Sequence, residues 1–338
     1  MSADVPDNNP SAVAAVPDEE TLRAAVRMAC WAPSVHNTQP WRWRLSAGAV
    51  HLFADRDRAL PATDPDGRDL LISCGAALHH LRVALAAFGW ATSTTRMPDR
   101  ADPDHLAAVT TRRAVSDQGG MADAVAITRR HSDRRAYTSR ALDRATLDVL
   151  VERAAREGVV AEVVRSTGAR RALRVLIAEA DRRQSADDRY LGELARWSGR
   201  PAGSPDGVPA RSTPAATRVG DLVVREFSAP ALLPSPGADN GGELLVLGTG
   251  SDDGESRLRA GEATSAVLLA ATALRLATCP LTQPMEVPEI RELLRTAVLA
   301  ADAVPQIILR VGWPAPGSGE LPHTPRRSPD SVLDARRG

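Results

Sequence analysis

Two polar segments of this 338-residue chain have residue types suited to binding a charged, hydrogen-bonding ligand. The first, residues 32–41, reads Ala-Pro-Ser-Val-His-Asn-Thr-Gln-Pro-Trp and lies between an expected helix and an expected strand. It presents Ser34, Asn37, Gln39 and several backbone amides within a few residues. Such a set of donors and acceptors suits a flat, polar ligand.

The second segment, residues 129–135, reads Arg-Arg-His-Ser-Asp-Arg-Arg and suits a phosphate. Arg130 and Arg134 offer guanidinium groups and Ser132 a hydroxyl, and ionised pairs of this kind are strong. The chain contains no lysine, so any anion clamp must be guanidinium, which grips phosphate in a bidentate fork. A solvated basic face at a helix end would have the same composition.

Basic residues recur near the C-terminus, in residues 323–329 (His-Thr-Pro-Arg-Arg-Ser-Pro). Arg326 and Arg327 could form a second anion clamp, or they could belong to a polar tail. A further polar turn, residues 279–283, contains Pro280, Leu281, Thr282 and Gln283. By residue type alone it is also compatible with an ordinary helix-entry turn.

Composition excludes several other classes. The 42 arginines balance 42 acidic residues, which argues against a nucleic-acid binder. The three cysteines have no metal-site spacing and indicate buried thiols in a reducing cytoplasm. The apolar stretch 70–90 is interrupted by histidine and arginine, so we expect a buried helix and no membrane span. No Ser-His-Asp, metal or glycine-rich dinucleotide motif is evident.

The periodicity predicts an α+β protein, with a disordered tail at residues 1–17. Asp18 should cap the first helix and Asp143 a later one. Residues 199–242 are rich in Pro, Gly and Ser and predict an irregular excursion. The remaining expected helices are 69–88, 102–109, 123–130, 170–197 and 261–276, and the expected strands are 41–45, 50–52, 159–165, 244–248 and 306–312.

The two halves of the chain resemble each other. Residues 75–92 align without a gap to 261–278 at an offset of 186, and residues 21–29 align to 146–154 at an offset of 125. The second copy therefore carries an insertion of about 61 residues between positions 155 and 260. Alanine-rich helices can also resemble one another by composition alone. We predict halves at 18–120 and 121–333, with a lid-like insertion at about 185–235.

These motifs together resemble the FMN-binding nitroreductase family. That family carries Arg-x-Ser-x-Arg early in the subunit, matched by Arg130, Ser132 and Arg134, and a basic residue near the C-terminus, matched by Arg326 and Arg327. Its Pro-Ser-x-x-Asn-x-Gln-Pro-Trp loop is matched by residues 33–41, with Pro33, Ser34, Val35, Asn37 and Gln39. The resemblance implies that residues 280–283 lie against the isoalloxazine, with a backbone N–H of Thr282 or Gln283 facing N5.

Each half carries only one of the two motifs. The phosphate motif occurs only in the second half and the Pro-Ser-x-x-Asn loop only in the first. This pattern resembles the fused, single-chain Acg branch of the family. It implies one FMN per chain, bound between the two halves of an intramolecular pseudodimer with mostly antiparallel sheets, and it makes a monomer the expected state.

The resemblance implies an oxidoreductase that passes hydride from NAD(P)H through FMN N5 to a nitroaromatic, a quinone or a similar small acceptor. Two alternatives stay open at this point. The insertion is long enough to fold over the flavin, which would favour FMN sequestration without turnover. A degenerate scaffold that binds no flavin is the third possibility.

Overall fold

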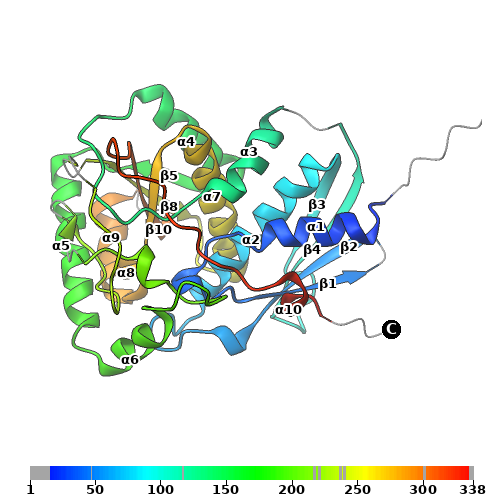
Figure 1. Cartoon of the computed structure of the whole chain (residues 1–338), viewed down its shortest axis with the longest axis horizontal. Coiled ribbons are helices and arrows are strands. Elements are labelled where there is room, and N and C mark those ends of the chain that lie inside the picture. The colour runs from blue at the N-terminus through cyan, green and yellow to red at the C-terminus, as the bar shows by residue number, and fades with distance from the viewer. Residues whose placement is uncertain are drawn as a thin grey trace, which may run out of the picture.

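The computed structural model describes residues 16–46, 48–115, 118–215, 218–219, 222–235, 238, 241–299 and 302–334. The predicted tail therefore lies outside the described residues except for Val16 and Pro17. Two β-sheets stand on either side of a central pair of long helices (Figure 1). The chain enters through the first half, builds the second, and returns to the first at its C-terminus (Figure 1).

The first half begins as the sequence predicts. Asp18 caps the first helix by accepting a 2.7 Å hydrogen bond from Thr21 N. Trp41 and Trp43 are fully buried and alternate with exposed residues, because one face of their strand covers the core. The elements of this half are α1 Glu19–Ala29, β1 Trp41–Ser46, β2 Ala49–Ala54, α2 Arg68–Ala87, β3 Trp90–Arg96 and β4 His105–Arg113.

The predicted helix at residues 102–109 is wrong. Residues His105–Arg113 form strand β4, which pairs antiparallel with β2 on one side and β3 on the other. Pro103 and Asp104 look like a helix start, but the following Val-Thr-Thr run favours extended backbone. Pairing with β2 and β3 on either side stabilises the extended conformation of this segment. Such pairing involves distant residues, so the local sequence does not predict it.

The second half contains the longer chain segments. The predicted helix 170–197 is two helices, because the chain turns at residues 185–187 and Asp187 caps the second by accepting from Arg189 N at 2.8 Å. The elements are α3 Gln118–Arg129, α4 Arg144–Arg156, β5 Val160–Val163, α5 Thr167–Gln184, α6 Asp188–Trp197, β6 Arg218–Val219, β7 Leu222–Val223, β8 Glu243–Thr249, α7 Gly254–Ala273, β9 Ala277–Leu281, α8 Gln283–Glu286, α9 Pro288–Val298, β10 Val304–Gly312 and α10 Pro329–Val332.

The two four-stranded sheets have the same topology. Their strand orders are β1-β2-β4-β3 and β5-β8-β10-β9, and every neighbouring pair is antiparallel. Helix α2 joins the second and third strands of the first sheet in chain order, as α7 does in the second. Two tandem halves would produce this arrangement. The connection between β5 and β8 differs most, because it contains α5, α6 and the irregular excursion.

The two central helices cross at a pair of glycines. A Cβ on Gly75 would lie 2.0 Å from the Leu258 carbonyl oxygen, and a Cβ on Gly261 would lie 2.0 Å from the Ile72 carbonyl oxygen. Gly75 and Gly261 are separated by 186 residues, as are Ile72 and Leu258, which is the offset found in the sequence. Such reciprocal contacts are typical of an interface between two equivalent units.

The sheets are covered differently. Helices α1 and α2 pack one face of the first sheet, whereas the second is covered by α4 and α7 on one face and by α5 and α9 on the other. Strand β10 is therefore apolar almost throughout, while β1 alternates. Among the described residues, α2 alone is long and apolar enough to cross a membrane, and 78% of its apolar window is buried inside the protein.

Candidate functional site

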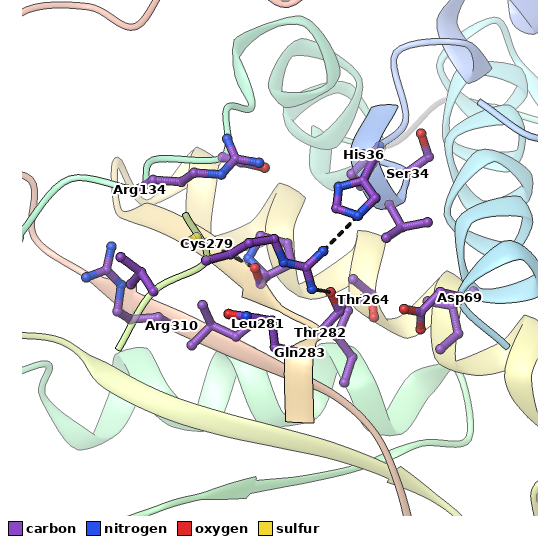
Figure 2. Close-up of a pocket in the computed structure, with 18 of the residues that line it drawn as sticks. Ser34, His36, Asp69, Arg134, Thr264, Cys279, Leu281, Thr282, Gln283 and Arg310 are labelled. Atoms are coloured by element: carbon purple, nitrogen blue, oxygen red, sulfur yellow. Dashed lines mark hydrogen bonds between the residues drawn. The ribbon is translucent and has the colours of Figure 1, made fainter. Parts of the chain in front are cut away.

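Two adjoining cavities lie between the halves. The wider one, called here the chamber, is lined by residues 33–36, the start of α2, residues 222–227 and the turn after β9. The narrower one, called here the anion pocket, is lined by residues 130–132 and by the C-terminal segment 321–326. Pro33, Ser34, Ser132 and Arg134 line both cavities, so the two are continuous. Figure 2 shows the chamber.

The loop after α1 has an unusual backbone. His36, Asn37 and Gln39 have φ angles of 47°, 54° and 51°, the left-handed region that non-glycine residues rarely adopt. Side chains hold the loop in this shape: Ser34 Oγ accepts from Gln39 N at 2.9 Å. Ser73 Oγ of α2 accepts from Val35 N at 3.2 Å. Strained backbone of this kind clusters at binding sites, where surrounding contacts determine it.

Arg130 and Arg326 give the anion pocket its charge. Arg130 Nε and Nη1 and Arg326 Nε are buried without a hydrogen-bond partner. Burial, followed by the neighbouring Arg326 and Arg134, lowers the pKa of Arg130 to about 9. Burial lowers the pKa of Arg326 to about 10. Two buried cations with free N–H groups are costly unless an anion neutralises them.

Arg134 connects the anion pocket to the chamber. Its Nη1 donates to the Ser212 carbonyl oxygen at 3.2 Å, and its guanidinium lies 4.9 Å from the Phe227 ring centroid. Both partners belong to the excursion between β5 and β8. Burial lowers the pKa of Arg134, since the charged form loses hydration.

The end of β9 and the start of α8 form one wall of the chamber. Pro280 and Leu281 end β9, Thr282 follows, and Gln283 begins α8. All four line the chamber, as the resemblance implies for a ligand-facing segment. Their polar side chains are bonded within the protein: Thr282 Oγ1 donates to Glu286 Oε1 at 2.6 Å. Gln283 Nε2 donates to Asp181 Oδ1 at 3.1 Å.

The excursion closes over the chamber through Arg225. Its Nη2 lies 2.5 Å from Glu286 Oε1. Its Nη1 donates to His36 Nε2 at 2.8 Å, a bond drawn at the His36 ring in Figure 2. Burial acts to lower the pKa of Arg225, but the Glu286 carboxylate raises it overall. Burial, then Arg225 and Arg134, hold the pKa of His36 well below its ordinary value, so its neutral ring accepts the bond.

The excursion also bonds to the loop after α1. Asn37 Nδ2 donates to the Gly207 carbonyl oxygen at 3.0 Å, and Gly207 N donates back to the Asn37 carbonyl oxygen at 3.3 Å. Arg58 pairs with Asp206 beside them. The predicted lid region therefore contacts the predicted ligand loop directly, and Asn37 still lines the anion pocket with a buried, unpartnered Oδ1.

The structure brings most of the predicted residues to one site and leaves two outside both cavities. Gln39 is fully buried, and its Oε1 accepts from Arg327 N at 2.8 Å. The Arg327 guanidinium lies 3.3 Å from Asp55 Oδ2. Consecutive side chains of an extended segment point to opposite sides, so Arg326 faces the pocket and Arg327 faces away from it. The residues brought together are Pro33, Ser34, Val35, Asn37, Arg130, Ser132, Arg134, Pro280, Leu281, Thr282, Gln283 and Arg326.

Sequence reasoning missed several residues that line the chamber. Arg225 and Phe227 come from a segment without periodicity, which gave no signal. Arg310 lies on β10 with buried, unpartnered Nε and Nη1 atoms. Asp69 lies beside Arg68 in the first turn of α2, where acidic residues are common, so its residue type gave no signal. Across the part of the chain that the structure describes, no cluster of metal-ligating side chains occurs.

The site is thus an elongated cavity with a cationic end, built between two halves of one topology. The family model described as the nitroreductase family matches residues 127–313, more than half of the chain. A Mycobacterium tuberculosis (strain H37Rv) protein named "Putative NAD(P)H nitroreductase Rv3131" is 44% identical, over 99% of this chain and 97% of its own length. The chain therefore belongs to the nitroreductase family.

One further relative and one solved structure are similar to this chain. The protein named "Putative NAD(P)H nitroreductase acg" from the same strain is 37% identical, over 94% of this chain and 96% of its own length. A solved structure of a nitroreductase with bound FMN from Desulfitobacterium hafniense DCB-2 is 14% identical and has a TM-score of 0.40. It covers 64% of this chain and 98% of its own.

Proposed function

We propose that this chain binds one FMN between its halves and uses it to pass hydride from NAD(P)H to a small acceptor such as a nitroaromatic or a quinone. The observation that carries the proposal is the buried pair Arg130 and Arg326, which both line the anion pocket and both have N–H groups without a hydrogen-bond partner. A terminal phosphate would neutralise them and accept charge-assisted hydrogen bonds. Family membership and the names of the relatives support the same chemistry.

The remaining site residues fit the rest of this cofactor. Ser132 and Arg134 line the passage from the anion pocket to the chamber, where a ribityl chain would run. The chamber offers apolar walls from Leu281, Val224 and Phe227, together with polar groups at its rim, as a flat heterocycle requires. FMN when bound supplies the hydride chemistry itself. This chain's residues bind it, orient it and exclude water.

The division of labour between the halves supports a single site per chain. The loop comes from the first half and the phosphate residues from the second, so one chain completes the site. We infer a fused, duplicated ancestor with halves at about 18–120 and 121–333, acting as a monomer. The three cysteines are buried and unpaired, which fits a reducing cytoplasm.

The test is spectroscopic. Purified protein should bind FMN with one equivalent per chain and show a flavin visible spectrum. Anaerobic NADPH should bleach that colour rapidly, and a quinone should restore it. A protein that ignores added FMN would refute the binding, and a coloured protein that NADPH leaves unchanged would refute the turnover.

FMN sequestration is a second candidate, favoured by the closed excursion. Arg225, Arg134 and Asn37 each link the excursion to the walls of the cavities, so the chamber is covered on that side. Under this alternative, colour persists with NADPH in the native protein. It bleaches in a variant that weakens the cover, such as Asp206→Asn, which removes the pairing with Arg58.

A further inference from the structure

Asp69 is a buried acid that none of the binding roles above uses. It lies in the first turn of α2, lines the chamber and is 3% exposed. Neither carboxyl oxygen has a hydrogen-bond partner. Figure 2 places it on the far side of the chamber from Arg134, away from the cationic end. Its backbone is fixed, because its carbonyl oxygen accepts from Ser73 Oγ at 2.6 Å.

Arg68 forms an ion pair with Asp69 but no hydrogen bond. Its Nη1 lies 3.8 Å from Asp69 Oδ1, while its Nη2 donates to Gln306 Oε1 at 2.7 Å. Arg225 is paired with Glu286. The Asp64 carboxylate accepts from Leu70 N at 2.8 Å. Because Leu70 follows Asp69 in the chain, this bond places a second carboxyl group close to Asp69. The charged groups that act on Asp69 are therefore Asp64 and Glu286, which oppose its ionisation, and Arg68 and Arg225, which favour it.

Burial dominates this balance. It raises the pKa of Asp69 well above the ordinary value, and Asp64 and Glu286 raise it further against the opposing effect of the two arginines. The raised pKa favours the protonated form of Asp69, in which the carboxyl group carries one O–H donor. A protonated acid facing a binding chamber is an arrangement that enzymes use to supply protons.

We propose that Asp69 is the proton donor to the electron acceptor in the chamber. This inference rests on the proposed function, which supplies the reductant, a reduced nicotinamide. A quinone that accepts hydride at one oxygen gains two electrons and one proton, and it needs one further proton to become the hydroquinone. The Asp69 O–H bond breaks, an O–H bond forms on the second oxygen, and the carboxylate regains its proton from water after the product leaves.

The experiment uses the FMN-loaded chain with Asp69→Asn and the matched control Asp66→Asn, an exposed neighbour. Asparagine has the shape of the neutral acid, so the fold should be kept. Anaerobic stopped flow separates bleaching by NADPH, which needs no donor to the acceptor, from the return of colour with benzoquinone. We expect D69N to slow colour return by about 100-fold and to leave bleaching unchanged within about twofold.

Infrared spectroscopy gives a readout that does not depend on turnover. The wild type and D66N should show a protonated-carboxyl band at neutral pH that weakens in D69N. Equal rates of colour return in all three proteins would overturn the proposal. An unchanged protonated-carboxyl band in D69N would also overturn it. If NADPH does not bleach the FMN-loaded wild type, the proposed function itself is refuted. The role of Asp69 as proton donor is then refuted with it.

Discussion

The two halves share one topology, yet in the part of the chain that the structure describes the two equivalent places between them are filled differently. Ala76 and Thr282 line the chamber. At the offset of 186 residues, their counterparts are Glu262 and Arg96. Arg96 Nε and Nη2 bond to the two Glu262 carboxyl oxygens at 2.7 and 3.0 Å, and Glu262 is fully buried. A bidentate ion pair therefore fills the place that a cavity occupies on the other side.

The surrounding residues complete this difference. Arg82 Nη1 bonds both Glu262 Oε1 and Glu157 Oε2 at 2.7 Å. Glu157 follows α4, where the first half has its ligand loop after α1. Asp69 of the open side, whose carboxyl group has no hydrogen-bond partner, corresponds to Glu255, an exposed residue paired with Arg259 at 2.8 Å. Equal topology thus leaves the number of sites undecided, and side-chain charge and volume determine it.

Removing the cations of the open site should have the largest effect. Arg130→Ala with Arg326→Ala should weaken FMN binding by about 100-fold or more, because each charge-assisted hydrogen bond contributes about 1.5–3 kcal/mol. Titration followed by flavin fluorescence measures the affinity. Arg129→Ala, an exposed neighbour, is the control and should change little. Full affinity in the double variant would contradict an anion site here.

Breaking the closed place should cost stability and leave FMN affinity largely unchanged. Glu262→Ala leaves Arg82 and Arg96 without their buried partner, so the free energy of unfolding should fall by about 3–5 kcal/mol. Adding Arg96→Thr, the residue type of the open side, should recover part of that loss. Chemical denaturation measures both, and Glu255→Ala on the same helix is the control. Simple additivity of the two losses would argue against a coupled pair.

Substituting either glycine at the crossing of α2 and α7 should lower stability by a similar amount, unlike substitutions at the two unequal sites. Gly75→Ala and Gly261→Ala each place a Cβ 2.0 Å from a carbonyl oxygen of the facing helix. Each should lower the free energy of unfolding by about 1–3 kcal/mol, and by similar amounts. Gly192→Ala in α6, where a Cβ would meet no atom within 4 Å, should be neutral or stabilising. A large difference between the two crossing variants would contradict their equivalence.

The last effect depends on pH. Because the folded pKa of Asp69 is raised, the folded state retains a proton that the unfolded chain releases above about pH 4. The stability contributed by this group is present at low pH and is lost as pH rises towards the folded pKa, by up to about 1.4 kcal/mol per pH unit. Asp69→Asn should therefore gain stability relative to wild type as pH rises. Urea unfolding of D69N, D66N and wild type at several pH values measures this. Parallel curves would contradict a neutral Asp69.

Much of the fold could be predicted because its signals are local. The caps at Asp18 and Asp143, the alternation of β1 and the apolar run of β8 each depend on neighbouring residues only. The offset of 186 residues also relates Gly75 to Gly261, the two glycines at which α2 and α7 cross, since duplicated units reuse the same positions. The phosphate motif and the ligand loop were visible for the same reason, as short runs of suitable side chains.

Other features depend on distant segments. Strand β4 forms between two strands that need it, and the excursion closes over the chamber through Arg225 and Glu286, which are far apart in the chain. By itself, the sequence determined the residue types, the capped helices and the two halves' shared pattern. Only the tertiary structure decided that Arg326, and not Arg327, lines the anion pocket. It also decided that the Asp69 carboxyl group has no hydrogen-bond partner, and that Glu262 and Arg96 fill the place equivalent to the chamber. Those outcomes depend on burial and on which charges meet, and both arise only when the halves pack together.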